Sequence, residues 1–173
     1  KLFVFLILCG GNYQRYLALR SVLGSAAARY GGYERGNFKL LPSLVPRGAA
    51  VNDIGAHLGL YLRGLLPIVG SAGRIIAVEP NPHLMRFLVK AFKNDRNISF
   101  VPGALTRETI GQVLLSEPIL FGVLPEPALA SLEELSFAKR QYEVEGITLD
   151  GLVAKEGLTR CDFIKIDVEG HEW

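Results

Sequence analysis

Apolar and polar residues follow one another, from residue 49 onward, in the order expected for buried strands alternating with amphipathic helices. Residues 49–54 and 74–79 are short and nearly continuously apolar, as is typical of parallel strands covered on both faces. Each is followed by a segment with apolar residues at helical spacing, at 58–66 and 82–92. Strands that alternate with helices in this way predict an α/β fold with a doubly wound, mostly parallel sheet.

The helix after the second strand is the clearest predicted element. Asn81 is a good N-cap, and Pro82 suits the first helical turn. The earlier helix, over 58–66, is expected to stop at Pro67, because proline has no backbone N–H to continue the helical hydrogen bonds. The predicted apolar face of the clearer helix comprises Leu84, Phe87, Leu88, Ala91 and Phe92.

The later part of the chain gives weaker signals. A short helix is predicted over 131–140, where acidic residues precede basic ones, and another begins at Asp150. Residues 161–168 predict a buried strand, and such a strand needs a further crossover and neighbour, so Trp173 is expected to be a truncation point. The other predicted strands cover residues 98–101, 113–115 and 143–149.

The first residues have a different character, so residues 1–43 are predicted as a partly helical N-terminal extension and 44–173 as the N-terminal part of the main domain. Residues 13–30 predict a helix that ends near the Gly31-Gly32 pair. Residues 33–44 are expected to form a loop or short extended pieces. The predicted helix face comprises Tyr16, Leu19, Leu23 and Ala26 or Ala27.

An apolar run at residues 2–9 is too short to cross a membrane, which takes about 20 apolar residues in a helix. It also lacks the charged lead and cleavage site of a signal peptide. Three interpretations stay open: a buried strand or helix turn, the trimmed end of a longer signal or anchor, or an interfacial contact. Membrane association is not expected from this run alone.

Composition limits the classes of partner. The 173 residues are 49% hydrophobic, enough for one domain with a substantial core, and the formal charge of +2 is too small and scattered to indicate a nucleic-acid partner. Cys9 and Cys161 fit no metal-ligand spacing and are predicted to be small buried residues. Their use suits a reducing compartment, so a cytoplasmic location is expected. The oligomeric state is not indicated.

The turn after the first predicted strand carries the first chemical signal, because ligands of open parallel sheets bind at the carboxyl ends of the strands. Gly55 lets the backbone turn sharply, and Gly59 lets the following helix sit close. Asp53, at the strand end, could neutralise a cationic group such as an amino-acid ammonium. For the turn alone, a strand-to-helix connection that merely needs glycine is an equal alternative.

A second acid changes that balance. Glu79 ends the next strand, where a carboxylate can accept two hydrogen bonds from ribose hydroxyls. The competing ligand is an NAD-type dinucleotide, whose fingerprint has three glycines, but this turn has Ala56 and His57 where the middle glycine should admit a pyrophosphate. S-adenosylmethionine carries a sulfonium, an ammonium and a carboxylate but no phosphate. An acid at the turn therefore favours this methyl donor.

Charged residues alternate with apolar ones over 164–172. Side chains alternate along a strand, so Lys165, Asp167 and Glu169 share one face. An internal ion pair of Lys165 with Asp167 or Glu169 would explain this pattern. Alternatively, the strand end lines a reaction site, where Asp167 contacts the methionine end of the cofactor or orients a hydroxyl, and Glu169 or His171 takes a proton. A metal site from these residues is not expected, because a further ligand is missing.

Together these motifs resemble the FkbM-type methyltransferases. Four segments carry the resemblance in order: VNDIGAHLGLY at 51–61, GRIIAVEPNP at 73–82, TLD at 148–150 and IKIDVEGHE at 164–172. The last is the most specific. The match begins near residue 44 and runs to the end, and residues 1–43 contribute nothing to it.

The resemblance implies a Rossmann-like class I methyltransferase fold, incomplete at the C-terminus, with S-adenosylmethionine as cofactor. It implies methylation of a hydroxyl on a small-molecule or sugar-like acceptor. His57 stands where the family usually has asparagine. Asp167, Glu169 and His171 are the catalytic candidates. The cofactor-binding candidates are Asp53, Gly55, Ala56, His57, Gly59, Glu79, Pro80, Asn81 and Asp167. An NAD-type oxidoreductase and a non-catalytic fragment of a methyltransferase stay as alternatives.

Overall fold

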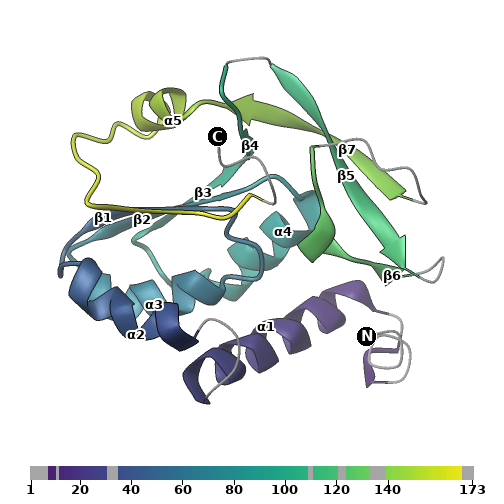
Figure 1. Ribbon diagram of the computed structural model, residues 1–173, viewed down its shortest axis with the longest axis horizontal. Helices are drawn as coiled ribbons and strands as arrows, with labels where there is room; N and C mark the ends of the chain where they lie inside the picture. Colours follow the sequence, from purple (N-terminus) through teal and green to yellow (C-terminus); the bar gives the residue numbers. More distant parts are fainter. Residues whose placement is uncertain are drawn as a thin grey trace.

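Four parallel strands form the central sheet, in the order β3-β2-β1-β8 (Figure 1). The computed structural model describes residues 8–10, 12–30, 35–108, 111–120, 124–132 and 139–168. Asp53 at the end of β1 lies opposite Ala77 on one neighbouring strand and Lys165 on the other. The strands are β1 (Ala50–Ile54), β2 (Arg74–Glu79), β3 (Ile98–Pro102) and β8 (Phe163–Ile166).

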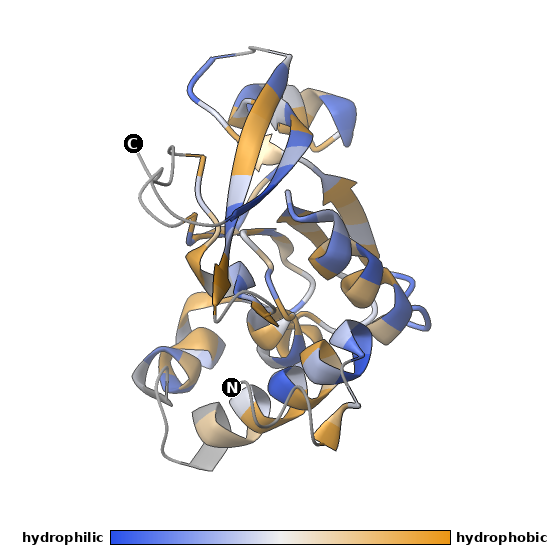
Figure 2. Cartoon of the chain, turned by 90° about the vertical axis from the view of Figure 1, so that its right-hand side faces the viewer, coloured by the Kyte–Doolittle hydropathy of each residue, from blue (hydrophilic) through white to orange (hydrophobic). Residues whose placement is uncertain are grey.

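Helices cover both faces of this sheet, which confirms the predicted α/β class. Figure 1 shows α1, α2, α3 and α4 on one side of the sheet and α5 (Leu149–Lys155) on the other. Successive strand residues face opposite clusters of the core: Ile75 packs on the four-helix side and Ile76 on the α5 side. The four helices are α1 (Tyr13–Tyr30), α2 (Arg35–Leu44), α3 (Leu60–Val69) and α4 (Pro82–Ala91). They carry both hydrophobic and hydrophilic positions, as elements with one buried face should (Figure 2).

A second sheet, which the sequence did not predict as a separate unit, stands at the carboxyl end of the first. Its order is β4-β7-β5-β6, and its two long strands pair antiparallel. These strands are β4 (Ala104–Leu105), β5 (Gln112–Leu120), β6 (Leu124–Pro125) and β7 (Lys139–Ile147), with a short 3-10 helix at Pro127–Leu129.

The helix predicted over 131–140 is wrong at both of its described ends. Ser131 forms a bridge with Ser116, and Lys139 and Arg140 pair with β5 as part of β7. Cross-strand pairing decides the conformation at both ends of this segment, although its local charge pattern suits a helix. Residues 133–138 lie outside the described part of the chain.

The loop predicted over 33–44 is also wrong, because Arg35–Leu44 forms the helix α2. Phe38 packs against Tyr61 of α3, with ring centroids 5.3 Å apart. Gly64 permits this approach, since a Cβ there would lie 2.7 Å from the Phe38 ring. Tertiary packing therefore stabilises a helix whose sequence contains Pro42.

Proline does not stop α3 as expected. The helix continues through Pro67 to Val69 and ends at Gly70, whose φ of 67° is left-handed and whose N–H donates to the Leu66 carbonyl. A proline in the last turn removes a single helical hydrogen bond, and the buried Val69 side chain favours the extra residues.

The clearest predicted helix is confirmed in its cap and most of its face. Asn81 Oδ1 accepts hydrogen bonds from the backbone N–H of His83, at 2.9 Å, and of Leu84, at 3.4 Å. Leu84, Phe87, Leu88 and Phe92 are buried, but Ala91 is exposed. The helix α1 also forms where predicted.

The buried face of α1 differs from the prediction. Tyr16, Leu17 and Ser21 are buried, whereas Leu23 is 57% exposed. Ala26 and Ala27 are exposed as well. The N-terminal half of α1 therefore makes the core contacts, and helical spacing alone did not identify which half would be covered.

The strand β8 was expected to be buried, but it forms an edge of the central sheet among the described residues. Ile164 and Ile166, which share one face of this strand, are 37% and 39% exposed. Cys161, just before β8, is exposed and not buried as predicted, while Cys9 is buried as predicted.

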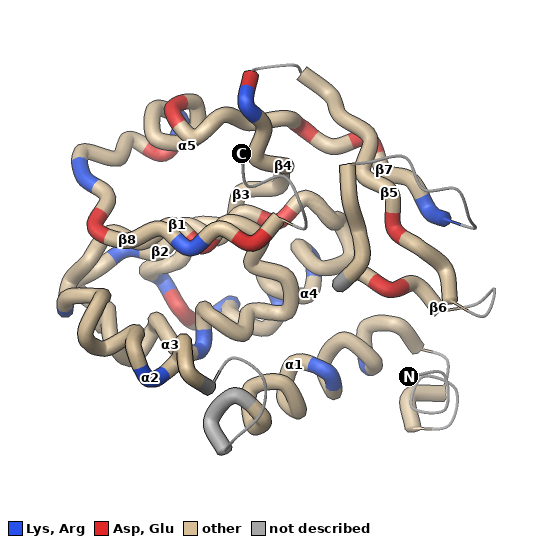
Figure 3. The backbone as a smooth tube through the Cα atoms, viewed as in Figure 1, with Lys and Arg blue, Asp and Glu red and all other residues tan. Residues whose placement is uncertain are grey.

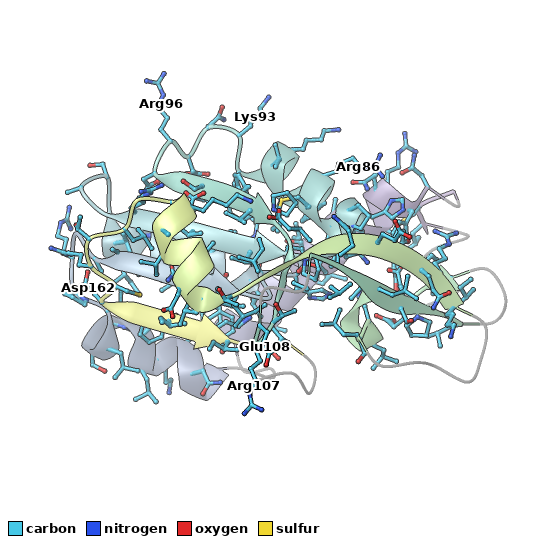
Figure 4. The ribbon with its side chains drawn as sticks, turned by 90° about the horizontal axis from the view of Figure 1, so that it is seen from above. Arg86, Lys93, Arg96, Arg107, Glu108 and Asp162 are labelled. Carbon is cyan, nitrogen blue, oxygen red and sulfur yellow. The ribbon has the colours of Figure 1, made fainter. Side chains whose placement is uncertain are left out.

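Charges are spread over the surface. Basic and acidic positions are distributed over most elements (Figure 3), and the labelled Arg86, Lys93 and Arg96 extend away from the body of the molecule (Figure 4). In the described part of the chain, no helix combines the length and apolar character needed to cross a membrane.

Candidate functional site

The turn between β1 and α3 is built from left-handed backbone. Gly55, His57 and Gly59 have φ values of 74°, 50° and 73°. A Cβ on Gly55 would collide with the carbonyl oxygen of Asp167, and one on Gly59 would collide with the Phe92 ring. Both positions thus require glycine for two reasons, the left-handed backbone and the close approach of neighbouring atoms.

Asp53 lies at the end of β1 and its side chain is fully buried. Among the described residues, neither of its carboxylate oxygens accepts a hydrogen bond, and its nearest cation is Lys165 Nζ, 3.4 Å from Oδ1. Burial raises the pKa of Asp53, and Lys165 opposes that rise. A buried carboxylate with one long ionic contact can take a further positive partner.

Lys165 reaches from β8 to the same turn. Its Nζ donates to the carbonyls of Gly55, at 2.7 Å, and Ile54, at 3.3 Å, and lies 3.7 Å from Asp167 Oδ2. The ion pair with Asp167 is one of the alternatives predicted from sequence. The contacts with Asp53 and the two carbonyls were missed, because they depend on β8 pairing beside β1 in a particular register.

Glu79, at the end of β2, is buried and accepts two backbone hydrogen bonds. Its Oε2 takes the N–H of His57, and its Oε1 takes that of Asn81, both at 2.8 Å. Burial nevertheless raises the pKa of Glu79 to about 7. Each oxygen of a carboxylate has a second lone pair, so this side chain can still accept from two ligand hydroxyls.

His57 lies half-buried in the same region, with its ring Nε2 fully covered. Burial, with Arg20 and Lys165 nearby, lowers the pKa of His57 to about 4, so the ring is neutral at pH 7. Its Nε2 has no hydrogen-bond partner among the described residues. Sequence reasoning did not indicate this environment, because it depends on α1 packing over the turn.

A cleft opens between the carboxyl ends of the parallel strands and the second sheet. Five predicted site residues line it: Gly55, His57, Glu79, Pro80 and Asp167. Asp53, Ala56, Gly59 and Asn81 are close in the chain but are not in its lining. Glu169 and His171 lie outside the described residues.

The opposite wall of the cleft was missed from sequence. It is mostly apolar, and it comes from β5 and the residues after β6. No motif marks these positions, and only the folding of the second sheet over the strand ends brings them to the site. They are Leu115, Pro127, Ala130, Ser131 and Leu132.

Solved structures give partial likenesses. A putative rRNA methylase from Clostridium thermocellum is 15% identical, with 40% of each chain covered and a TM-score of 0.38. A SAM-dependent methyltransferase from Aquifex aeolicus is 19% identical, with 43% of this chain and 41% of that chain covered and a TM-score of 0.38. Fibrillarin from Aeropyrum pernix, in complex with natively bound S-adenosyl-L-methionine, is 28% identical over 40% of this chain and 32% of its own, with a TM-score of 0.37.

These alignments span less than half the length of each solved protein. No curated protein matches the chain. The sequence model of the methyltransferase FkbM domain, however, matches residues 53–173, which is well over half of the chain and includes the turn, Glu79 and β8. The chain therefore belongs to the FkbM methyltransferase family.

Proposed function

We propose that this chain binds S-adenosylmethionine at the carboxyl ends of β1, β2 and β8 and supports transfer of its methyl group to a hydroxyl oxygen. The observation that carries the proposal is the gathering of Glu79, Asp167 and the glycine turn around one cleft. When bound, the cofactor supplies an electrophilic methyl group on a sulfonium. The remaining work falls to the side chains and backbone of the protein.

Each acidic group has a distinct proposed task. Glu79 accepts hydrogen bonds from the ribose hydroxyls, for which both of its oxygens retain lone pairs. Asp167 lines the cleft, is 62% exposed, and contacts the methionine end or orients the acceptor hydroxyl. Asp53 does not line the cleft, so its contribution is electrostatic: its buried negative charge favours a cation beside the turn.

The residues after β8 complete the catalytic proposal. Glu169 or His171 takes the proton from the acceptor hydroxyl, and the fold contributes by aligning that oxygen with the donor. Neither residue is in the described part of the chain, so their roles rest on the sequence motif alone. The mostly apolar second wall suits the adenine ring or the uncharged body of a small or sugar-like acceptor.

The dinucleotide alternative has weaker support. The turn holds Ala56 and His57 in place of a middle glycine, and the buried Asp53 beside it would repel a pyrophosphate.

Both described cysteines are free, which supports a reducing compartment such as the cytoplasm as the site of action.

A methyl-transfer assay tests the proposal. The chain is incubated with S-adenosylmethionine carrying a labelled methyl group and a panel of hydroxylated small molecules, including sugars. A labelled methyl ether is expected, and Glu79→Gln should reduce its formation. The control, Glu145→Gln, alters an exposed carboxylate paired with Lys155 and should leave it unchanged. Label found on nitrogen, sulfur or carbon would contradict hydroxyl methylation.

A further inference from the structure

A buried carboxylate in the second sheet connects three elements. Glu117, on β5, is fully buried. Its Oε1 accepts the hydroxyl of Tyr13 from α1 and the side-chain amide of Asn81, both at 3.1 Å. Its Oε2 accepts the hydroxyl of Tyr142 from β7, at 2.8 Å. Four residues that are far apart in the chain therefore meet at one carboxylate.

The two phenols are fixed as donors. Burial and the nearby Glu117 raise the pKa of Tyr13, and the same causes raise the pKa of Tyr142 to about 12. Both hydroxyls thus stay protonated at neutral pH. Both phenols donate to the Glu117 carboxylate, so they hold it against the side-chain amide of Asn81.

Asn81 connects Glu117 to the candidate site through two hydrogen bonds. Its side-chain amide nitrogen donates to Glu117, and its Oδ1 caps α4. Its own backbone N–H donates to Oε1 of Glu79, at 2.8 Å. The orientation of Asn81 therefore affects one of the two hydrogen bonds that fix the Glu79 carboxylate. Side chains that orient such a group affect binding although they touch no ligand.

A second set of contacts ties α1 to the other side of the site. Ser21 Oγ donates to the carbonyl of Leu58 in the turn after β1, at 2.8 Å, and Arg63 donates to Ser21. Arg20 pairs with the buried Glu126 at 2.6 Å. The helix α1 thus contacts the turn after β1 directly and reaches the loop after β2 through Glu117.

We infer that α1 is a positioning element of the cofactor site, in which Tyr13, through Glu117 and Asn81, holds the Glu79 carboxylate in its ligand-accepting orientation. This inference rests on the proposed function, because it assigns Glu79 to the cofactor. It extends the site to residues that precede the matched segment 53–173.

A double-mutant cycle tests the inference. Affinity for S-adenosylmethionine is measured by calorimetric titration for the wild type, Tyr13→Phe, Glu79→Gln and the double variant. Tyr13→Phe is expected to weaken binding about 3- to 10-fold, the typical effect of losing one hydrogen bond. In the Glu79→Gln background the same change should have little further effect, because the path ends at Glu79. Equal losses in both backgrounds would overturn the inference.

The matched control is Gln14→Met. Gln14 also makes a hydrogen bond from α1 to the start of α4, to the carbonyl of His83 at 3.4 Å, but it does not touch Glu117. Its affinity should stay within twofold of the wild type. Thermal unfolding of each variant separates lost binding from lost folding. An equal loss of affinity in Gln14→Met would overturn the specific path through Glu117.

The outcomes distinguish the two proposals. A wild-type chain that folds but does not bind overturns the proposed function and the inference with it, whereas wild-type binding with full affinity in Tyr13→Phe overturns the inference alone. If Glu79→Gln abolishes measurable binding, the backbone amide resonance of Asn81 provides the readout. Tyr13→Phe should shift that resonance while Gln14→Met leaves it in place, and an unchanged resonance in Tyr13→Phe would overturn the inference.

Discussion

Gly55 combines a left-handed φ of 74° with close contact to the backbone of Asp167, just after β8. We predict that Gly55→Ala costs several kcal/mol of unfolding free energy, roughly 2 to 4, because the methyl group must displace the Asp167 carbonyl. Gly24→Ala is the control: Gly24 lies inside α1 with open space around it, so alanine should stabilise by about 0.5 to 1 kcal/mol. Urea denaturation measures both, and equal effects would contradict this account of the turn.

Glu79 makes cofactor affinity depend on pH. Its pKa of about 7 means that the carboxylate protonates within the neutral range and then has fewer lone pairs for ribose hydroxyls. Affinity for S-adenosylmethionine should fall about tenfold as the pH is lowered from 8 to 6. In Glu79→Gln that fall should be absent. Titrations across this pH range check the prediction, and a dependence that persists in the variant would assign it to another group.

In the unbound protein, a rise in pH lowers the contribution of Glu79 to folding stability, although it raises the affinity for the cofactor. Its pKa is raised above the ordinary 4.5, so the folded state holds the proton more tightly than the unfolded state. Its contribution to stability is present below pH 4.5 and is lost as the pH rises through about 7. A ligand that satisfies the ionised carboxylate offsets this loss.

His57 should make the fold sensitive to acid. Its folded pKa is about 4 against an ordinary 6.5, so its contribution to stability is present above pH 6.5 and is lost as the pH falls toward 4. Relative to His57→Asn, the wild type should lose about 2 to 3 kcal/mol between pH 7.5 and 4.5. Denaturation of both proteins at the two pH values measures the difference. A pH-independent difference would show that His57 is not a buried neutral ring.

The sequence motifs predicted where the candidate site residues lie better than they predicted which side chains pack around them. The places of Asp53, Gly55 and Glu79 at strand ends and in the turn could be predicted, because strand ends and glycines leave a local pattern; their roles in binding the cofactor stay predictions. The bonds of Lys165 to the turn and those of Glu117 to Tyr13 could not, since they join residues about 100 positions apart. Register and packing, which set such contacts, leave no signal at either residue alone.

Among the elements, α1 and the second sheet are joined by a buried ion pair. Arg20 is 22% exposed and Glu126 is fully buried. We predict that Arg20→Met lowers the unfolding free energy by about 2 to 4 kcal/mol, because it removes the guanidinium from a buried carboxylate. Lys155→Met breaks an exposed pair with Glu145 and should cost under about 0.5 kcal/mol. Chemical denaturation distinguishes them, and similar costs would contradict a structural role for Arg20.

Element prediction succeeded where one local signal was sufficient. The strand β2 and the helix α4 match their predicted starts, because a continuous apolar run and an Asn-Pro cap are unambiguous. It failed at α2, whose helix depends on Phe38 packing against α3, and at the start of β7, which depends on pairing with β5. In both failures a partner distant in sequence decides the local conformation.

For the whole molecule, the cleft lies where a parallel sheet meets a second, mostly antiparallel one. The α/β class and the edge of the sheet that carries the site followed from the order of strands and helices. The second sheet did not, because the strands predicted at 113–115 and 143–149 carry no local sign that they pair with each other. Consequently one wall of the candidate site was foreseeable and the other was not.

Calorimetric titration of the chain with S-adenosylmethionine, and separately with NAD, decides whether the strand ends of the parallel sheet bind the methyl donor. We expect saturable one-to-one binding of S-adenosylmethionine, weakened by Glu79→Gln but not by Glu145→Gln, and no binding of NAD. A folded chain that binds NAD instead, or binds S-adenosylmethionine equally well in both variants, would contradict it.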